Sequence, residues 1–373
     1  MKRNKLIKIF AIMMIAILSL GTLASCGKKE ADSKKLKIVV TTFPEYDWVR
    51  EILGDRVKDV DLKLLQKNGT DLHSFQPSAQ DIKDISNADI FVYVGGESDE
   101  WVADVLKKKK NKDLVAINLM DEMKDSKKAE EVKEGMQPEK EDEGDGHHHE
   151  NAEEVEYDEH VWLSLKNAIK LCKPIEQAIA KKDEKHADTY KKNLDAYTKK
   201  LENLDNKYAE AVKNAKVKTL IFGDRFPFRY MVDDYGLNYY AAFVGCSAES
   251  EASFETISFL SNKLNQLKIK HVLTIENSDH KIANSVIKNA DGTKRDIKTL
   301  DSLQSMKKGD LKKKTYLKTM ENNLKVLQEV FDEGRLFTIR LVLRQTPVLT
   351  IDLKQLLSRL GLVCFGIIGE ETQ

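Results

Sequence analysis

Cysteine is scarce in this sequence, and its positions exclude two kinds of site. Only four occur among 373 residues, at Cys26, Cys172, Cys246 and Cys364, and none forms a Cys-x-x-Cys pair. Neither a disulfide framework nor a zinc site built from closely spaced thiolates is therefore indicated. The sequence predicts that any metal site uses nitrogen and oxygen ligands.

The sequence also lacks the motifs of several enzyme classes. No His-Glu-x-x-His, Gly-x-Ser-x-Gly or P-loop pattern occurs, although histidine and carboxylate ligands could also build a secreted zinc hydrolase. Glu159, beside His160, is the candidate general base for such an enzyme, but adjacent side chains on a strand or loop point apart. Lys plus Arg equals Asp plus Glu at 61 each, so nothing points to a nucleic-acid partner. We expect a binding protein and not an enzyme.

The N-terminus has the pattern of a bacterial lipoprotein signal. A basic start is followed by an apolar run from about Leu6 to Leu23 and then by Ala-Ser-Cys-Gly, which contains Cys26. An uncleaved anchor helix is the alternative interpretation of the run. We predict a signal peptide at 1–25, lipidation of Cys26 and a flexible tether at 26–35. The protein would then be held at the cell membrane on its extracytoplasmic face.

Short β-branched runs alternate with longer amphipathic segments through the rest of the chain, which is typical of an α/β fold. The predicted strands are 36–43, 60–65, 90–95, 114–119, 218–223, 237–243, 271–276 and 296–300. Predicted helices surround Trp48, Ile82, Val102, Tyr230, Phe259, Ile287 and Leu324. Because each half of the chain repeats the arrangement, we predict two similar lobes, at 36–180 and 217–331.

A single long helix is predicted between the two lobes. Residues 181–216 contain neither Gly nor Pro, and apolar or aromatic residues recur at spacings of three and four from Tyr190 to Tyr208. About thirty helical residues would span roughly 45 Å. The sequence therefore predicts a rigid linker helix that joins the lobes, with the ligand site in the cleft between them.

Ligand sites of open parallel sheets lie beyond the carboxyl ends of the strands. The polar residues predicted to lie there, or at the end of the acidic middle segment, are His73, His160, Asp224, Arg225, Glu276, Asp279 and His280. One imidazole or carboxylate from each of four loops would suit a four-coordinate metal site. Singly, each residue is equally well explained as a helix cap or a hydrogen-bonded loop residue; together they favour a metal.

Two motifs resemble those of a known family. His-Ser-Phe-Gln-Pro-Ser begins at His73, and Asp-Glu-His-Val-Trp-Leu-Ser begins at Asp158. With the acidic loop and the predicted linker helix, they resemble the solute-binding lipoproteins of bacterial zinc and manganese ABC transporters, of the ZnuA and TroA type, over roughly residues 36–331. The resemblance implies a monomer that captures a divalent ion for a membrane permease and its ATPase. An adhesin or a zinc sensor of the same fold is an alternative.

The resemblance implies that His73 and His160 are metal ligands, and it leaves two ligands to assign. In the family a further ligand opens the motif that ends in Tyr-Gly-Leu. Counting back without a gap reaches Arg225, which cannot bind a cation, whereas a shift of one residue selects Asp224. The family's carboxylate ligand corresponds to Asp279. Glu276 and His280 are the alternatives to Asp279.

The acidic segment at 121–157 contains three consecutive histidines, His147, His148 and His149. It shows no apolar periodicity, so we predict a mobile, solvated loop outside the core. Ordering a flexible chain costs free energy, so these imidazoles would capture zinc only weakly. A solvated insert with incidental histidines is the alternative. Zinc members of the family carry such loops, which makes Zn²⁺ the expected ion and Mn²⁺ the alternative.

The resemblance ends near Phe331, and a largely apolar, arginine-bearing tail follows at 332–373. Charges interrupt the tail too often for it to span a bilayer. Two interpretations stay open: an additional hairpin or helix on the C-terminal lobe, or an out-of-frame extension.

Overall fold

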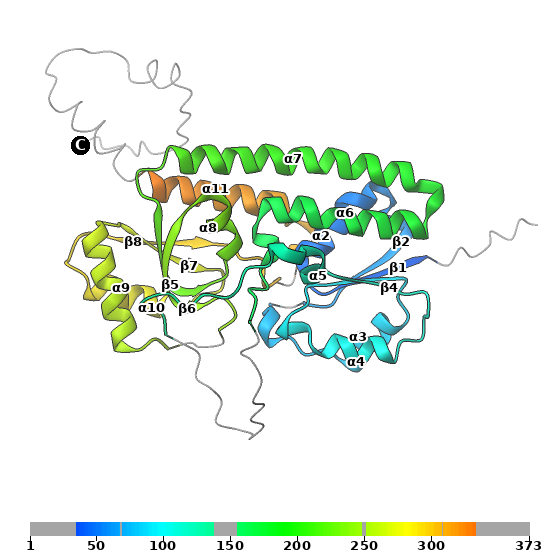
Figure 1. Ribbon diagram of the computed structural model, residues 1–373, viewed down its shortest axis with the longest axis horizontal. Helices are drawn as coiled ribbons and strands as arrows, with labels where there is room; N and C mark the ends of the chain where they lie inside the picture. Colours follow the sequence, from blue (N-terminus) through cyan, green and yellow to red (C-terminus); the bar gives the residue numbers. More distant parts are fainter. Residues whose placement is uncertain (1–34, 68, 138–154, 248–250, 308, 333–373) are drawn as a thin grey trace, which may run out of the picture. The chain divides into compact units, whose positions relative to one another are not determined.

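The computed structural model describes residues 35–67, 69–137, 155–247, 251–307 and 309–332, which form two compact units (Figure 1). The first unit contains the residues up to Lys127, together with Asn167–Lys200 and Leu303–Tyr316; the second contains Lys128–Lys166, Leu201–Ser302 and the residues from Leu317. The predicted signal peptide, Cys26, the three consecutive histidines and the tail from residue 333 lie outside the described residues. No helix in the described ranges has the length and apolar character of a membrane span.

The first unit is built on a four-stranded parallel sheet. Its strands are β1 (Leu36–Val40), β2 (Val60–Leu64), β3 (Ile90–Tyr93) and β4 (Val115–Asn118), in the order β2-β1-β3-β4. The helices are α2 (Phe43–Leu53), α3 (Ala79–Ser86), α4 (Trp101–Lys107), α5 (Leu119–Met123) and α6 (Leu165–Lys182). All four strands coincide with predicted ones.

Both faces of this sheet are covered, which explains the apolar runs of its central strands β1 and β3. On one face α3 and α4 pack on the sheet through Ile85 and Val102, against Val39 and Phe91 (Figure 1). On the other face α2 buries Trp48 completely. The Trp48 ring meets Tyr316 edge to face, with the ring centroids 5.4 Å apart.

The second unit repeats the topology of the first. Its parallel strands are β5 (Thr219–Phe226), β6 (Asn238–Val244), β7 (His271–Ile275) and β8 (Asp296–Leu300), in the order β6-β5-β7-β8. The helices are α8 (Arg229–Tyr235), α9 (Phe254–Leu267), α10 (Lys281–Asn289) and α11 (Tyr316–Phe331). In each sheet the first strand lies between the second and the third, so the predicted pair of similar α/β lobes is confirmed.

The core of the second unit requires close contact between a helix and a strand. Leu260 and Leu264 of α9 pack with Val286 of α10 against the sheet. A Cβ at Gly223 in β5 would lie 2.5 Å from the Cα of Ala283, so only glycine permits α10 to approach this strand.

The predicted linker helix is present as α7 (Ala187–Lys213), but it begins later than predicted. The preceding helix continues to Lys182, and the chain breaks at Asp183. The Asp183 carboxylate accepts hydrogen bonds from Tyr190 Oη at 2.5 Å and from the His186 ring at 2.9 Å, which fixes the turn before α7. Residues of α7 up to Lys200 belong to the first unit and those from Leu201 to the second.

The acidic segment differs from the prediction at its edges. Met123 and Met136 are buried. The Asp158 N–H donates to the Lys128 carbonyl at 2.9 Å, and the Gln137 N–H donates to the Ala242 carbonyl at 3.0 Å. The edges of the segment are therefore part of the packed structure. The sequence pattern did not predict this, because isolated apolar side chains and backbone hydrogen bonds hold the edges without a helical or strand periodicity. Only 138–154 is left outside the described residues.

Candidate metal centre

His160 lies in the second unit with its imidazole completely buried. Asp158 holds it in two ways: one carboxylate oxygen accepts the His160 N–H at 2.8 Å and lies 3.0 Å from ring Nδ1. Trp162 packs edge on to the ring, with the centroids 5.3 Å apart. A carboxylate on one ring nitrogen fixes the orientation and tautomer of a histidine, as is common for metal ligands. Any ion would bind through Nε2.

Asp158 is itself fixed by its surroundings. Burial raises the pKa of its carboxyl to about 7, opposed by the hydrogen bond from His160 and by the charge of Arg229. Tyr230 donates its hydroxyl to the Asp158 carbonyl at 2.9 Å and accepts the Lys128 N–H at 3.1 Å. The same tyrosine therefore ties the start of the acidic segment to the Asp-Glu-His motif.

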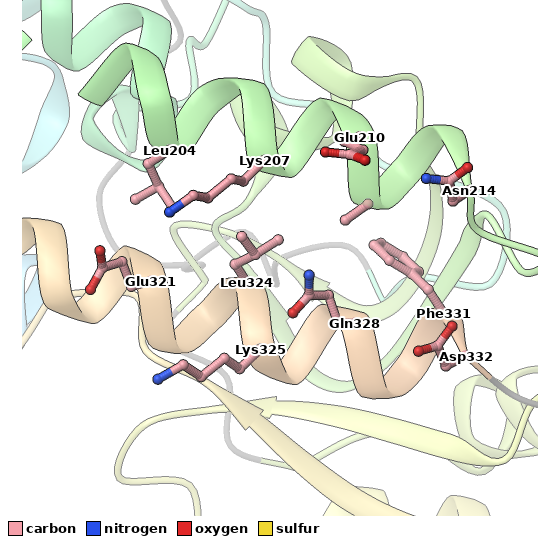
Figure 2. Close-up of a pocket in the computed structure, with 11 residues that line it drawn as sticks. Leu204, Lys207, Glu210, Asn214, Glu321, Leu324, Lys325, Gln328, Phe331 and Asp332 are labelled. Carbon is pink, nitrogen blue, oxygen red and sulfur yellow. The ribbon is translucent and has the colours of Figure 1, made fainter. Parts of the chain in front are cut away.

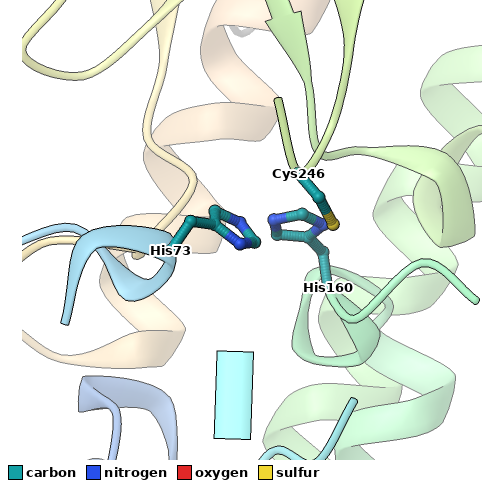
Figure 3. Close-up of side chains that lie close together, drawn as sticks. All are labelled: His73, His160 and Cys246. Carbon is teal, nitrogen blue, oxygen red and sulfur yellow. The ribbon is translucent and has the colours of Figure 1, made fainter. Parts of the chain in front are cut away.

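Cys246 is a residue that the sequence analysis did not select, and it lies beside His160 (Figure 3). A donor atom of the His160 ring and the Cys246 sulfur are within 4.8 Å of each other. Cys246 lies just after β6, separated from it by Gly245, and is half-buried. Burial, and then the carboxylates of Asp158, Glu130 and Glu159, raise the pKa of this thiol well above its usual value.

Gly245 permits the chain at Cys246 to lie close to His160. A Cβ at residue 245 would lie 3.1 Å from His160 Nδ1 and 2.9 Å from the carbonyl oxygen of Phe226. The spacing of the cysteines in the sequence could not predict the pair of His160 and Cys246, because the partner of Cys246 is a histidine distant in sequence. The available signal was the Gly-Cys-Ser turn after the predicted strand at 237–243, at a strand's carboxyl end.

His73 belongs to the first unit, where it sits in a single helical turn at Leu72–Ser74. Its N–H donates to Asp71 at 3.1 Å, and its ring Nδ1 lies 2.9 Å from the hydroxyl of Ser98. Like His160, it is held through Nδ1, so Nε2 is the nitrogen that would bind an ion.

Asp224 and Arg225 lie near the end of β5. The Asp224 carboxylate accepts the Arg225 N–H at 2.9 Å and the Ile275 N–H at 3.3 Å. The Arg225 guanidinium donates to the Ser247 carbonyl at 3.3 Å. Asp224 is thus bonded to neighbouring strand ends, and it is not part of the metal-ligating group that contains His160.

The three candidates after β7 have different surroundings. Asp279 is exposed and pairs with Lys281, whose ammonium is 2.5 Å away and lowers the pKa of the Asp279 carboxyl. Glu276 accepts hydrogen bonds from Ser302, and burial together with Asp301 raises its pKa. His280 opens α10, and its ring Nδ1 lies 3.2 Å from the hydroxyl of Thr274. The structure does not place these three in the group with His160.

A hollow of about 690 Å³ lies elsewhere in the second unit, between α7 and α11 (Figure 2). Lys207 and Glu210 project from α7, and Glu321 and Lys325 from α11, above the buried side chains of Leu204 and Leu324. Its lining contains neither histidine nor cysteine. Its mixed charges and lack of nitrogen or sulfur ligands make it a poor zinc site.

Two parallel α/β units of the same strand order, with a long helix that contributes to both, define the class of bilobed binding proteins. A buried imidazole oriented by a carboxylate is the kind of ligand that a metal-binding member requires. The chain belongs to the family of the zinc-uptake complex component A, periplasmic (ZnuA), whose pattern matches residues 38–330.

Similar proteins agree with this assignment. The zinc-binding lipoprotein AdcA of Streptococcus pneumoniae is 33% identical over 330 residues, which are 87% of this chain and 62% of the relative. The high-affinity zinc uptake system protein ZnuA of Bacillus subtilis is 29% identical, over 82% of this chain and 92% of the relative. The chain thus spans less than two thirds of the length of its AdcA relatives.

Solved structures show the same fold. The Zn(II)-bound ZnuA-like domain of Streptococcus pneumoniae AdcA aligns with a TM-score of 0.60 at 31% identity, covering 80% of this chain and 99% of that domain. The laminin-binding protein Lmb of Streptococcus agalactiae, described as bifunctional with adhesin and metal transporting activity, aligns with a TM-score of 0.63 at 25% identity, over 80% of this chain and all of Lmb. The predicted resemblance to this family is therefore confirmed.

Proposed function

We propose that this protein captures Zn²⁺ outside the cytoplasm and delivers it to an ABC permease for uptake. The observation that carries the proposal is His160, which is completely buried and is fixed by Asp158 within a family motif. Contacts within the protein orient the His160 ring, so the ring needs no bound ion to reach the orientation of a metal ligand. The protein acts as a monomer, with the permease and, through it, the ATPase as partners.

His73 and His160 supply the first two ligands through Nε2. Both rings are held through Nδ1, by Ser98 and Asp158, which leaves the orientation of each Nε2 determined before an ion arrives. This ligand pair requires His73 of the first unit and His160 of the second to bind one ion.

Asp224 and Asp279 are the proposed carboxylate ligands, with Glu276 and His280 as alternatives. The ion pair of Asp279 with Lys281 is exposed, and exposed pairs contribute little free energy, so Asp279 would lose little on exchanging its partner for a metal. Asp224 would give up the hydrogen bond from Ile275, which is long at 3.3 Å.

Zinc is the proposed ion because imidazole ligands bind it more tightly than manganese at a comparable site. The zinc-binding names of AdcA and ZnuA support the same choice. His147, His148 and His149 would add weak, transient capture, and a lipid on Cys26 would keep the protein at the extracytoplasmic membrane surface. Mn²⁺ is the alternative ion. An additional adhesin role is favoured only by the similarity to Lmb.

The proposal is tested by competition titration of zinc against a chromophoric chelator. His73→Ala and His160→Ala should each weaken binding by orders of magnitude, whereas the control His186→Ala should not, because His186 bonds Asp183 before α7. Manganese should fail to displace zinc. If both ligand variants bind zinc as tightly as the wild type, His73 and His160 are not the ligands. If manganese displaces zinc in the competition, zinc is not the preferred ion. Zinc-loaded protein should hydrolyse neither peptides nor esters.

A further inference from the structure

We propose that the sulfur of Cys246 is a zinc ligand together with His160, so that the capture site combines nitrogen and sulfur. The inference rests on the proposed capture of zinc. It puts a ligand that the family resemblance does not imply in the place of one of the two proposed carboxylates, so that the site stays four-coordinate. It also replaces the expectation that any metal site of this chain uses nitrogen and oxygen alone.

The distance between the two donor atoms suits a common ion. Zinc binds imidazole nitrogen at about 2.05 Å and thiolate sulfur at about 2.3 Å, and a tetrahedral angle between them separates N and S by roughly 3.6 Å. In the structure the His160 and Cys246 donor atoms lie within 4.8 Å. The N–S separation that a shared zinc ion requires lies within this limit, and His160 is held in place by Asp158.

The backbone around Cys246 is held close to His160. Gly245 lies against the imidazole, where any Cβ would meet ring Nδ1 at 3.1 Å. The Cys246 N–H donates to Glu130 at 3.2 Å, and the next carbonyl, of Ser247, accepts from Arg225 at 3.3 Å. These contacts therefore fix the backbone from which the Cys246 side chain projects, which is part of the preorganisation that a ligand needs.

The surroundings of Cys246 differ from those of a cysteine that only fills space. Cys172 is completely buried in α6, as an inert core thiol usually is. Cys246 is half-buried and faces the carboxylates of Asp158, Glu130 and Glu159. A cluster of negative charge around the sulfur attracts a divalent cation.

Zn²⁺ forms a bond to the Cys246 sulfur, the S–H bond breaks, and the proton leaves to solvent or buffer, with no change in oxidation state. Thiolate is a soft ligand that zinc accepts readily and manganese does not. Cys246 would therefore favour zinc over manganese at this site more strongly than a carboxylate in its place.

Cobalt substitution tests the ligand directly. Full-length protein carrying Cys26→Ser, solubilised in detergent, is titrated with Co²⁺, and a thiolate ligand gives a charge-transfer band in the near ultraviolet. We expect the band to appear, to vanish on addition of zinc and to be absent from Cys246→Ser. Loss of the ligand should weaken zinc binding on the order of a hundredfold or more, beyond the effect of losing an outer partner, and should narrow the preference for zinc over manganese.

Two control variants identify the cysteine that gives the charge-transfer band. Cys172→Ala and Cys364→Ser should retain it. A measurement without a site variant covers the case in which Cys246→Ser fails to fold: zinc should protect Cys246 of the Cys26→Ser protein from alkylation, as identified by peptide mass spectrometry. Tight zinc binding that depends on His160 but gives neither band nor protection would overturn the Cys246 ligand and leave the proposed function intact. Absence of tight zinc binding in the unsubstituted site would overturn both.

Discussion

One carboxylate oxygen of Asp158 contacts both the backbone N–H and the ring Nδ1 of His160, at 2.8 and 3.0 Å. The two residues are separated by Glu159 alone, so the contact that orients the imidazole is local in sequence. It also explains why the Asp-Glu-His order of the motif matters chemically: the aspartate is a positioning residue for the histidine.

Replacing Asp158 should therefore weaken zinc binding although it is not itself a proposed ligand. We expect Asp158→Ala to lower zinc affinity by about 10- to 100-fold, the usual cost of removing a partner that orients a ligand. Asp158→Asn should retain part of the affinity, because its amide oxygen can still accept from Nδ1. Asp195→Ala, on an exposed part of α7, is the control for loss of an aspartate. Equal affinities of Asp158→Ala and this control would contradict the orienting role.

The proposed carboxylate ligands can be separated by conservative substitution. Asp224→Asn and Asp279→Asn should each weaken zinc binding about tenfold or more if their oxygens contact the ion, since an amide is a poorer ligand than a carboxylate. Glu276→Gln and His280→Ala should have smaller effects. If Glu276→Gln or His280→Ala weakens zinc binding more than Asp279→Asn does, then Glu276 or His280 is the ligand instead of Asp279. A zinc-bound crystal structure with Asp224 several ångströms from the ion would show that Asp224 is not a ligand.

Deleting 138–154 should leave tight zinc binding nearly unchanged and abolish a weak additional component in calorimetry. The weak component should fade in the intact protein as the pH falls through about 6.5, because imidazoles gain protons there and lose their lone pairs. Loss of tight binding on this deletion would mean that one of His147, His148 and His149 is a primary ligand.

A larger deletion of Asp121 to Glu156 should behave differently. It removes buried Met123 and Met136 and the hydrogen bond from Gln137 to Ala242, so the free energy of unfolding should fall. Thermal unfolding of both deletions distinguishes loss of packing from loss of metal capture.

Cys26→Ser should prevent lipidation. The variant should accumulate as unprocessed precursor or be released, and metabolic labelling with a radioactive fatty acid should fail. Lipid labelling at the wild-type level would refute the anchor. Zinc affinity should be unaffected, because Cys26 precedes the first strand of the fold.

The buried carboxyl of Asp47 should make the free energy of unfolding depend on pH. Burial, opposed by Arg50 and by the Tyr316 N–H, raises the pKa of its carboxyl from 3.8 to about 6. The folded state then retains a proton that the unfolded chain has released, so the contribution of this carboxyl to stability is largest below about pH 4 and declines as the pH rises to about 6. Asp47→Asn should remove this decline.

The measurement compares the unfolding free energies of Asp47→Asn and the wild type by urea denaturation between pH 4 and pH 7. At 1.36 kcal/mol per pH unit, the difference should move in favour of the variant by roughly 3 kcal/mol as the pH rises. Asp195→Asn serves as the exposed control. A difference that stays constant with pH would show that Asp47 ionises alike in both states.

The sequence by itself determined most elements of the fold in the described residues. The eight strands described there were predicted because short β-branched runs alternate with longer amphipathic segments, a pattern that is visible locally. The helix from Ala187 to Lys213 was equally visible, because helical spacing repeats within a few residues. Its start was misplaced, since the break at Asp183 depends on the hydroxyl of Tyr190 and the ring of His186. The helices α5 and α6 were not predicted.

The sequence also selected His73 and His160, because each belongs to a short motif whose residues act on one another locally: Asp71 contacts His73, and Asp158 contacts His160. Only the tertiary structure brought Cys246 to His160. That contact depends on how the end of β6 packs against the loop after the acidic segment and on the absence of a side chain at Gly245. Metal ligands are selected by distance in space, and chain spacing records that distance only when the ligands share one element.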